Sequence, residues 1–160
     1  MICSPFKKKN FGFTLIELLI VIAIIAILTT FGAASYSRIQ KGSRDTQRKA
    51  DLAQVRGALE QFYSDFDRYP GSDANGRIND ASCTPPNPAW GTGSFSCTPA
   101  GETLKTYLHQ LPNNPRGNDY LYNVGGTGQT YCLGVILETV ATGTSTCGTS
   151  GLNYVLTQTD

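Results

Sequence analysis

The sequence has little with which to build a catalytic or metal centre. It contains one histidine, His109, and its five cysteines include no Cys-x-x-Cys pair. A lone histidine without a matching nucleophile does not make a general base, and four-cysteine zinc sites usually contain closely spaced cysteine pairs. Asp65 and Asp67 are most simply solvated charges at a helix end. The sequence therefore predicts no enzyme, no metal site and no cofactor.

Proline is absent from Phe13 to Tyr69, and Pro70 follows directly. A helix over this whole stretch would have about 57 residues and a length of about 85 Å at 1.5 Å per residue. Its first half is apolar on all sides. In its second half apolar side chains recur every three or four residues and so share one face: Leu52, Val55, Leu59, Phe62 and Phe66. We expect this second half to pack against a folded domain.

Three lysines, at positions 7–9, precede the apolar run "GFTLIELLIVIAIIAIL" at residues 12–28. A basic stretch ahead of an apolar run is typical of a cleavable secretory signal or of a membrane anchor whose lysines stay in the cytoplasm. Both interpretations export the rest of the chain. An ordinary signal peptide would be cut beside the small residues Gly32 to Ala34, although the helical pattern continues past that point.

One carboxylate, Glu17, interrupts the apolar run. An acidic side chain inside a bilayer is costly, so such a residue usually has a partner. Two alternatives need no partner: Glu17 could lie among the lipid headgroups, or the run could be a secretory signal that tolerates one polar residue. In the first helical turn the helix dipole favours an anion, but too weakly to offset burial. An intermolecular partner is the sharper interpretation.

The same run resembles the class III signal of type IV pilins and type II secretion pseudopilins. The match rests on Gly12, Phe13, Thr14 and Glu17 at the family's spacing ahead of an apolar helix. The resemblance implies that a prepilin peptidase cuts after Gly12 and methylates the amine of Phe13. It also implies that Glu17 of a neighbouring subunit neutralises this amine as the helices pack side by side.

Two later stretches resemble the major pseudopilins in particular. They are "ALEQFYSDFDRYP" at residues 58–70 and "YLHQLPNNPRGNDYLYN" at residues 107–123. Major pseudopilins carry an acidic calcium-binding loop near the C-terminus, whereas residues 138–153 here contain no aspartate and a single glutamate, Glu138. The calcium site is therefore not carried over. A type IV pilus subunit for adhesion, motility or DNA uptake remains the alternative.

The resemblance implies an α+β pilin fold. Residues 1–12 would be the leader peptide, 13–36 the transmembrane and assembly helix, and 37–160 the extracytoplasmic head.

Within the head we expect an amphipathic helix over residues 37–69, a loop region over 70–119 and an antiparallel sheet over 120–160. The proline-rich loop region would contain one short helix at 102–111. The sheet would present alternating apolar residues to the long helix: Tyr131, Leu133, Val135 and Leu137.

Cysteine usage supports an exported head. Cys3 would leave with the leader, and an even number of cysteines outside the cytoplasm favours disulfides. Four cysteines allow three pairings. Their order along the chain suggests two local couples, Cys83 with Cys97 and Cys132 with Cys147.

Residues 38–49, which we name the basic segment, contain five basic side chains and one acid, Asp45: Arg38, Lys41, Arg44, Arg48 and Lys49. One interpretation is a solvated helix face on which Asp45 pairs with Lys41 and Lys49. Another is contact with the heads of neighbouring subunits, because residues 70–160 carry more acidic than basic side chains. Nucleic-acid binding is only weakly signalled, since the aromatic and basic residues are not interleaved.

These features together predict a structural subunit. It would wait in the inner membrane as a single-pass protein and then polymerise with copies of itself into a helical periplasmic or cell-surface filament. A type II secretion pseudopilus is the first interpretation and a type IV pilus the second. The expected partners are the prepilin peptidase, the inner-membrane assembly platform, minor pilins or pseudopilins, and the lipid bilayer before assembly. A membrane-anchored binding module is a third alternative, which an absence of polymers would favour.

Overall fold

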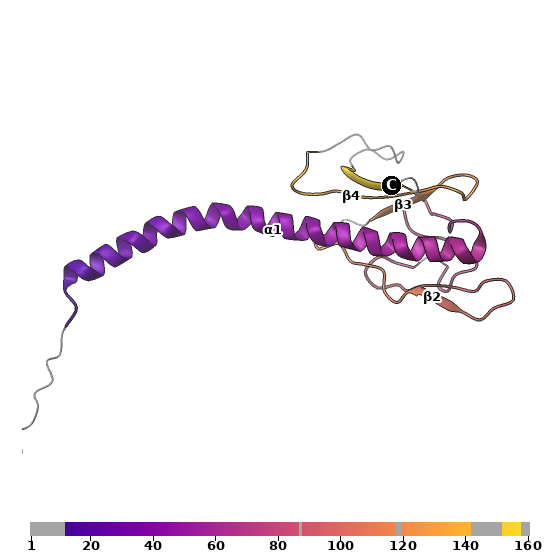
Figure 1. Cartoon of the computed structure of the whole chain (residues 1–160), viewed down its shortest axis with the longest axis horizontal. Helices are drawn as coiled ribbons and strands as arrows, with labels where there is room; N and C mark the ends of the chain where they lie inside the picture. Colours follow the sequence, from indigo (N-terminus) through magenta and orange to yellow (C-terminus); the bar gives the residue numbers. More distant parts are fainter. Residues whose placement is uncertain (1–11, 87, 118–119, 142–151, 158–160) are drawn as a thin grey trace, which may run out of the picture. The chain divides into compact units, whose positions relative to one another are not determined.

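A computed structural model describes residues 12–86, 88–117, 120–141 and 152–157 (Figure 1). Its main element is helix α1, Leu15–Phe66, which corresponds to the predicted long helix. Five short strands follow: β1 Phe95–Cys97, β2 Lys105–Leu108, β3 Leu121–Val124, β4 Tyr131–Val135 and β5 Tyr154–Thr157. The chain divides into two compact units, Met1–Ile39 and Gln40–Asp160, and the second unit contains all five strands.

The C-terminal end of α1 is set by local sequence. Asp67 adopts a positive φ of 55°, and its N–H donates a hydrogen bond of 2.8 Å to the carbonyl of Tyr63. A residue in the left-handed region commonly closes a helix, and Pro70 cannot continue one. These signals explain why α1 ends at Phe66, slightly before the predicted end at Tyr69.

The hydrophobic core of the second unit forms around the C-terminal half of α1. The predicted apolar stripe is buried: Leu52, Val55, Leu59 and Phe62 are all 0% exposed. The ring of Phe62 stacks on Phe95 of β1 and meets Tyr107 of β2 edge-on, with centroid distances of 5.6 Å in both cases. Full burial of one such side chain contributes about 1.5–3 kcal/mol to folding. The stripe therefore holds this half of α1 to the head.

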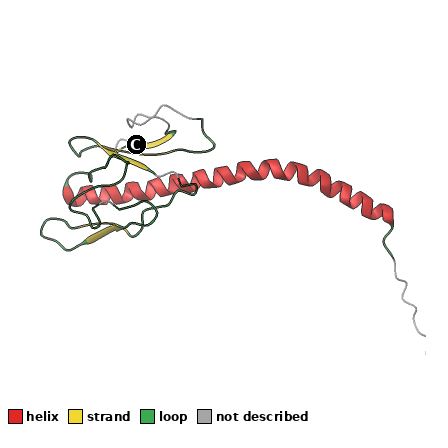
Figure 2. Cartoon of the chain, turned by 180° about the vertical axis from the view of Figure 1, so that it is seen from behind, coloured by secondary structure: helices red, strands yellow, loops and turns green. Residues whose placement is uncertain are grey.

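A three-stranded antiparallel sheet, in the order β3-β4-β5, lies on one side of this half of α1 (Figures 1 and 2). Leu133 of the central strand is paired with Tyr122 of β3 and Leu156 of β5. The alternating residues predicted to face the core are buried: Tyr131, Leu133, Val135 and Leu137. The long helix and this sheet confirm the predicted α+β fold.

A second sheet, of strands β1 and β2, lies on the other side of α1 and corrects one prediction (Figure 1). The sequence analysis placed a short helix at residues 102–111, but β2 occupies this stretch and pairs with β1, Phe95 opposite Leu108. A β-strand lets Tyr107 and Leu108 become buried while the backbone hydrogen-bonds to β1. Tertiary pairing therefore outweighs local helix propensity, and the 70–119 region is not purely loop.

Candidate functional site

The predicted assembly residues lie at the N-terminal end of α1. Gly12 is exposed and Phe13 is 87% exposed. The first turns of α1 then expose large apolar side chains to the surroundings, among them Leu15, Ile16 and Leu19. In the part of the chain that the structure describes, α1 is the one helix long and apolar enough to cross a membrane, and its apolar window is not buried by this chain. A surface of this kind is suited to lipid or to other protein chains.

Glu17 is hydrogen-bonded within its own chain. Its Oε2 accepts hydrogen bonds from the backbone N–H and the hydroxyl of Thr14, both at 2.8 Å, and its own N–H donates to the Thr14 hydroxyl at 3.3 Å. This reciprocal pattern is a capping box, which satisfies helix N–H groups that lack an intrahelical partner. The T-x-x-E spacing signals it, and the sequence analysis missed it. Within the described ranges, Oε1 of Glu17 has no hydrogen bond.

In the second unit, arginines of the basic segment form ion pairs inside the head. Arg44 donates two hydrogen bonds to the carboxylate of Glu138, at 2.8 and 2.6 Å. Arg48, which is 2% exposed, contacts Asp45 at 2.7 Å and Glu138 at 3.0 Å. The sequence analysis paired Asp45 with Lys41 and Lys49, whereas the structure pairs it with Arg48. The predicted pairs considered only neighbours on the helix, whereas Glu138, which is distant in sequence, contacts both Arg44 and Arg48.

Asp45 is the buried centre of this cluster. Its carboxylate accepts hydrogen bonds from the backbone N–H groups of Glu138 and Thr139, and from the Thr139 hydroxyl at 2.6 Å. Burial by itself raises the pKa of Asp45, but the hydrogen bonds from Thr139, Glu138 and Arg48 outweigh it and lower the pKa to about 2. Asp45 therefore stays ionised and ties the segment after β4 to α1.

Tyrosines of the head donate hydrogen bonds to carboxylates on α1. Tyr120 bonds to Asp51 at 2.5 Å and Tyr107 to Asp65 at 2.6 Å. Lys105 also contacts Asp65 at 2.5 Å, so Asp65 is not the freely solvated charge that the sequence suggested. Burial, together with the neighbouring carboxylate, raises the pKa of Tyr107 and Tyr120, so both phenols remain hydrogen-bond donors.

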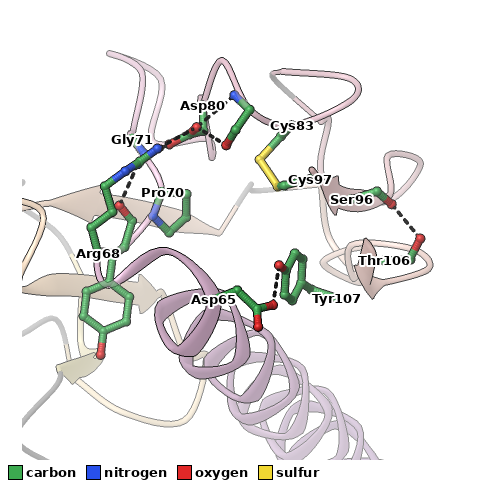
Figure 3. The surroundings of a disulfide bond; sticks show 12 residues. Asp65, Arg68, Pro70, Gly71, Asp80, Cys83, Ser96, Cys97, Thr106 and Tyr107 are labelled. Carbon is green, nitrogen blue, oxygen red and sulfur yellow. Dashed lines mark hydrogen bonds and ion pairs between the residues drawn. A yellow bond between two sulfur atoms is a disulfide. The ribbon is translucent and has the colours of Figure 1, made fainter. Parts of the chain in front are cut away.

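A disulfide joins Cys83 to Cys97, as the sequence analysis expected (Figure 3). Cys132, in β4, is also a disulfide cysteine. Its predicted partner, Cys147, lies outside the described residues, so that pairing stays a prediction.

An ion pair stabilises the chain segment beside this disulfide. Figure 3 shows Arg68 reaching Asp80, and their closest atoms are 2.5 Å apart. Asp80 also accepts hydrogen bonds from Ser82 and from the N–H of Gly71. Burial raises the pKa of Asp80, but Arg68, Ser82 and Gly71 outweigh it and hold the pKa well below its usual range. The irregular segment after α1 is thus fixed by polar contacts as well as by the bridge.

The remaining predicted residues that the structure describes do not form a second site. His109 is exposed in the loop after β2. Within the described residues, no group of three histidine, cysteine or acidic side chains is placed to hold a metal ion. Two candidate functional features are left in the described residues. One is the exposed apolar half of α1 with Glu17, and the other is the surface of the head.

Comparison with known proteins found one matching family model and several similar proteins. A family model described as the prokaryotic N-terminal methylation motif matches residues 7–33. The type IV major pilin protein PilA of Myxococcus xanthus is 41% identical over 66 residues, which are 41% of this chain and 30% of that protein. Type II secretion system core protein G of Vibrio cholerae is 27% identical over 115 residues, 72% of this chain and 71% of that protein.

The chain is similar to type IV pilins and to type II secretion major pseudopilins. Core protein G of Escherichia coli, 27% identical over 122 residues, covers 75% of this chain and is itself covered to 77%. The similarity to the Myxococcus pilin therefore spans less than half of either chain, whereas the similarity to the pseudopilins extends into the head. No solved structure matches the chain.

Proposed function

We propose that this protein is the structural subunit of a helical extracytoplasmic filament of the major-pseudopilin kind, which supports protein secretion by a type II secretion system. The observation that carries the proposal is the methylation motif followed by an apolar helix that its own chain leaves exposed. A surface of this kind can be covered by lipid before assembly and by copies of the same helix afterwards. The protein is not an enzyme in this proposal.

The subunit matures in steps that follow from its N-terminal residues. The leader, residues 1–12, stays in the cytoplasm until a prepilin peptidase cuts after Gly12 and methylates the amine of Phe13. Residues 13–36 anchor the subunit in the inner membrane as a single span, and residues 37–160 form the extracytoplasmic head. The inner-membrane assembly platform and minor pilins or pseudopilins then add it to the filament.

Glu17 directs assembly by neutralising the Phe13 amine of a neighbouring subunit. The carboxylate is suited to this role because Thr14 binds Oε2 and leaves Oε1 without a hydrogen bond in the described residues. The capping box also fixes the carboxylate in the first turn of α1. An uncompensated charge in a packed, low-dielectric helix bundle is strongly destabilising, so one missing partner should stop polymerisation.

Two Glu17 variants separate the charge from the cap. Glu17→Gln keeps an oxygen that can accept from Thr14 but removes the charge, whereas Glu17→Ala removes both. Expressed with the assembly machinery, both variants should insert, be cut after Gly12 and carry an N-methylated Phe13 by mass spectrometry, yet give no sheared filaments. Normal filaments from Glu17→Gln would reject the pairing role. A mature N-terminus near Ser35 would indicate ordinary signal-peptide cleavage and contradict the whole proposal.

A type IV pilus subunit is the second candidate, because 66 residues of the chain are matched to the Myxococcus pilin at 41% identity. Deleting the gene separates the candidates. Loss of a secreted protein without loss of surface filaments supports the pseudopilus, whereas loss of surface filaments with normal secretion supports the pilus.

A further inference from the structure

A polar hollow lies on the surface of the second unit, between α1 and the loop after β2. It encloses about 310 Å³ and is lined from α1 by Gln47, Asp51 and Gln54 and from the loop by Gln110 and Asn113. Leu111 and Pro112 complete the lining. Four side-chain amides and one carboxylate thus face one small space, and none of the described residues that line it is basic.

The hydrogen-bonding capacity of this hollow is largely unused. The amide of Gln110 donates to the carbonyl of Gly91, and Oδ2 of Asp51 accepts from Tyr120. Within the described residues, Oδ1 of Asp51 has no hydrogen bond, and the side chains of Gln47 and Gln54 have none. The free groups are therefore mainly oxygen acceptors beside a negative charge, which suits a cationic donor.

The basic segment contains cationic side chains that could fill this role. Most of those in the second unit already have a partner within the head. Arg44 and Arg48 pair with Glu138 and Asp45, and Lys49 lies over the ring of Tyr154 at 5.3 Å from its centroid. Lys41 is exposed and makes no ion pair within the part of the chain that the structure covers. Lys41 does not pair with Asp51 of its own chain, because ten residues of helix separate the two Cα atoms by about 15 Å.

We infer that the hollow receives Lys41 from a second copy of this chain in the filament. The inference rests on the proposed function, in which α1 helices of neighbouring copies run side by side. Lysine suits this hollow better than arginine does. Because Tyr120 already donates to one oxygen of Asp51, the carboxylate cannot bind a guanidinium through both oxygens. An ammonium needs only one carboxylate oxygen and nearby amide oxygens. The pair would fix an axial offset of about 15 Å between the two copies.

Charge substitutions test the contact by its effect on assembly. Asp51→Asn keeps an oxygen acceptor for Tyr120 and removes the charge, so the head should stay folded. We expect Asp51→Asn and Lys41→Gln each to lower the yield of sheared filaments by about two- to fivefold, as loss of a partly exposed ion pair does. The double variant should be no worse than either single variant. Full additivity of the two losses, or wild-type yield from both single variants, would overturn the inference.

Cysteine cross-linking tests the contact without disturbing Asp51. Lys41→Cys combined with Gln54→Cys should give a ladder of cross-linked subunits on non-reducing gels of sheared filaments, and none from unassembled membrane subunits. Lys41→Cys combined with Glu102→Cys is the matched control, because Glu102 is exposed and lies away from the lining. Normal filaments without a ladder, or an equal ladder from the control, would overturn this inference alone. An absence of filaments from the unaltered chain would instead overturn the proposed function.

Discussion

Ile24, in the first half of α1, is 52% exposed, whereas Leu59, in the second half, is 0% exposed. Both are large aliphatic residues in one continuous helix. Around Leu59 the head supplies Phe95, Tyr107 and the sheet residues that exclude water. The apolar side chains around Ile24 have no such cover from the described residues of the chain. The comparison shows that burial within the chain stabilises the head, while among the described residues the first half of α1 receives no such stabilisation.

The largest effect should come from breaking the buried ion cluster of the head. Arg48→Met leaves the carboxylate of Asp45 buried without its cation, and breaking such a pair costs about 3–5 kcal/mol. We expect a clearly lower midpoint of thermal unfolding for the full chain in detergent. Lys41→Met, an exposed site in the same segment, is the control and should change the midpoint little. Equal midpoints for the two variants would show that the cluster does not stabilise the head.

A core truncation should separate the two halves of α1. Leu59→Ala leaves a cavity at a fully buried position and should lower the free energy of unfolding of the head by about 2–5 kcal/mol. Ile24→Ala removes a similar side chain from an exposed position and should leave head unfolding unchanged. Near-ultraviolet circular dichroism of both variants in detergent measures the difference. A comparable loss from Ile24→Ala would mean that the first half also contributes to the stability of the head.

Removal of the disulfide should destabilise the head by a similar or smaller amount. Cys83 and Cys97 are 14 residues apart, and constraint of the unfolded chain over such a loop is worth about 3 kcal/mol in the chain-entropy model. The double variant Cys83→Ser/Cys97→Ser should therefore unfold at a lower denaturant concentration. Peptide mapping without reduction checks the bridge itself, and the same map tests Cys132 with Cys147. Crossed pairs or free thiols would contradict the predicted connectivity.

Acid should weaken the head through Asp45. Its pKa lies at about 2 in the folded protein, below the ordinary value of 3.8, so the folded state favours the ionised form. The resulting stabilisation is present above about pH 4 and is lost as the pH falls towards 2, by about 2 kcal/mol in total. Asp45→Asn should remove this part of the pH dependence, as unfolding curves recorded between pH 5 and 2 would show. An unchanged pH dependence would assign the acid sensitivity to other carboxylates.

The smallest effect is expected at the start of α1. Thr14→Ala removes the capping hydroxyl, a change that typically costs about 1 kcal/mol of helix stability. Amide hydrogen exchange in detergent should become faster in the first turn and remain unchanged near Leu59. Thr29→Ala is the control, because the Thr29 hydroxyl bonds to the carbonyl of Ala26 inside the helix and caps nothing. Equal rates of amide exchange in the first turn of the two variants would contradict the capping role of Thr14.

The sequence by itself determined the features that depend on near neighbours. The apolar run, the proline-free stretch and the three- and four-residue spacing of Leu52 to Phe66 predicted α1 and its buried face. Period-two alternation predicted the β4 face, and local order suggested the pairing of Cys83 with Cys97. The T-x-x-E capping box at Thr14 and Glu17 is equally local, because its hydrogen bonds join residues three positions apart.

Tertiary structure decided the contacts between residues far apart in the chain. Glu138 pairs with Arg44, from which it is separated by 94 positions, and with Arg48. Pairing by helical spacing alone therefore chose the wrong partners for Asp45. Strand β2 is present where a helix was expected, because its backbone pairs with β1 and Tyr107 is buried in the core. The reason is physical: helix periodicity and turn signals act over a few residues, whereas strand pairing and buried charge depend on which segments the fold brings together.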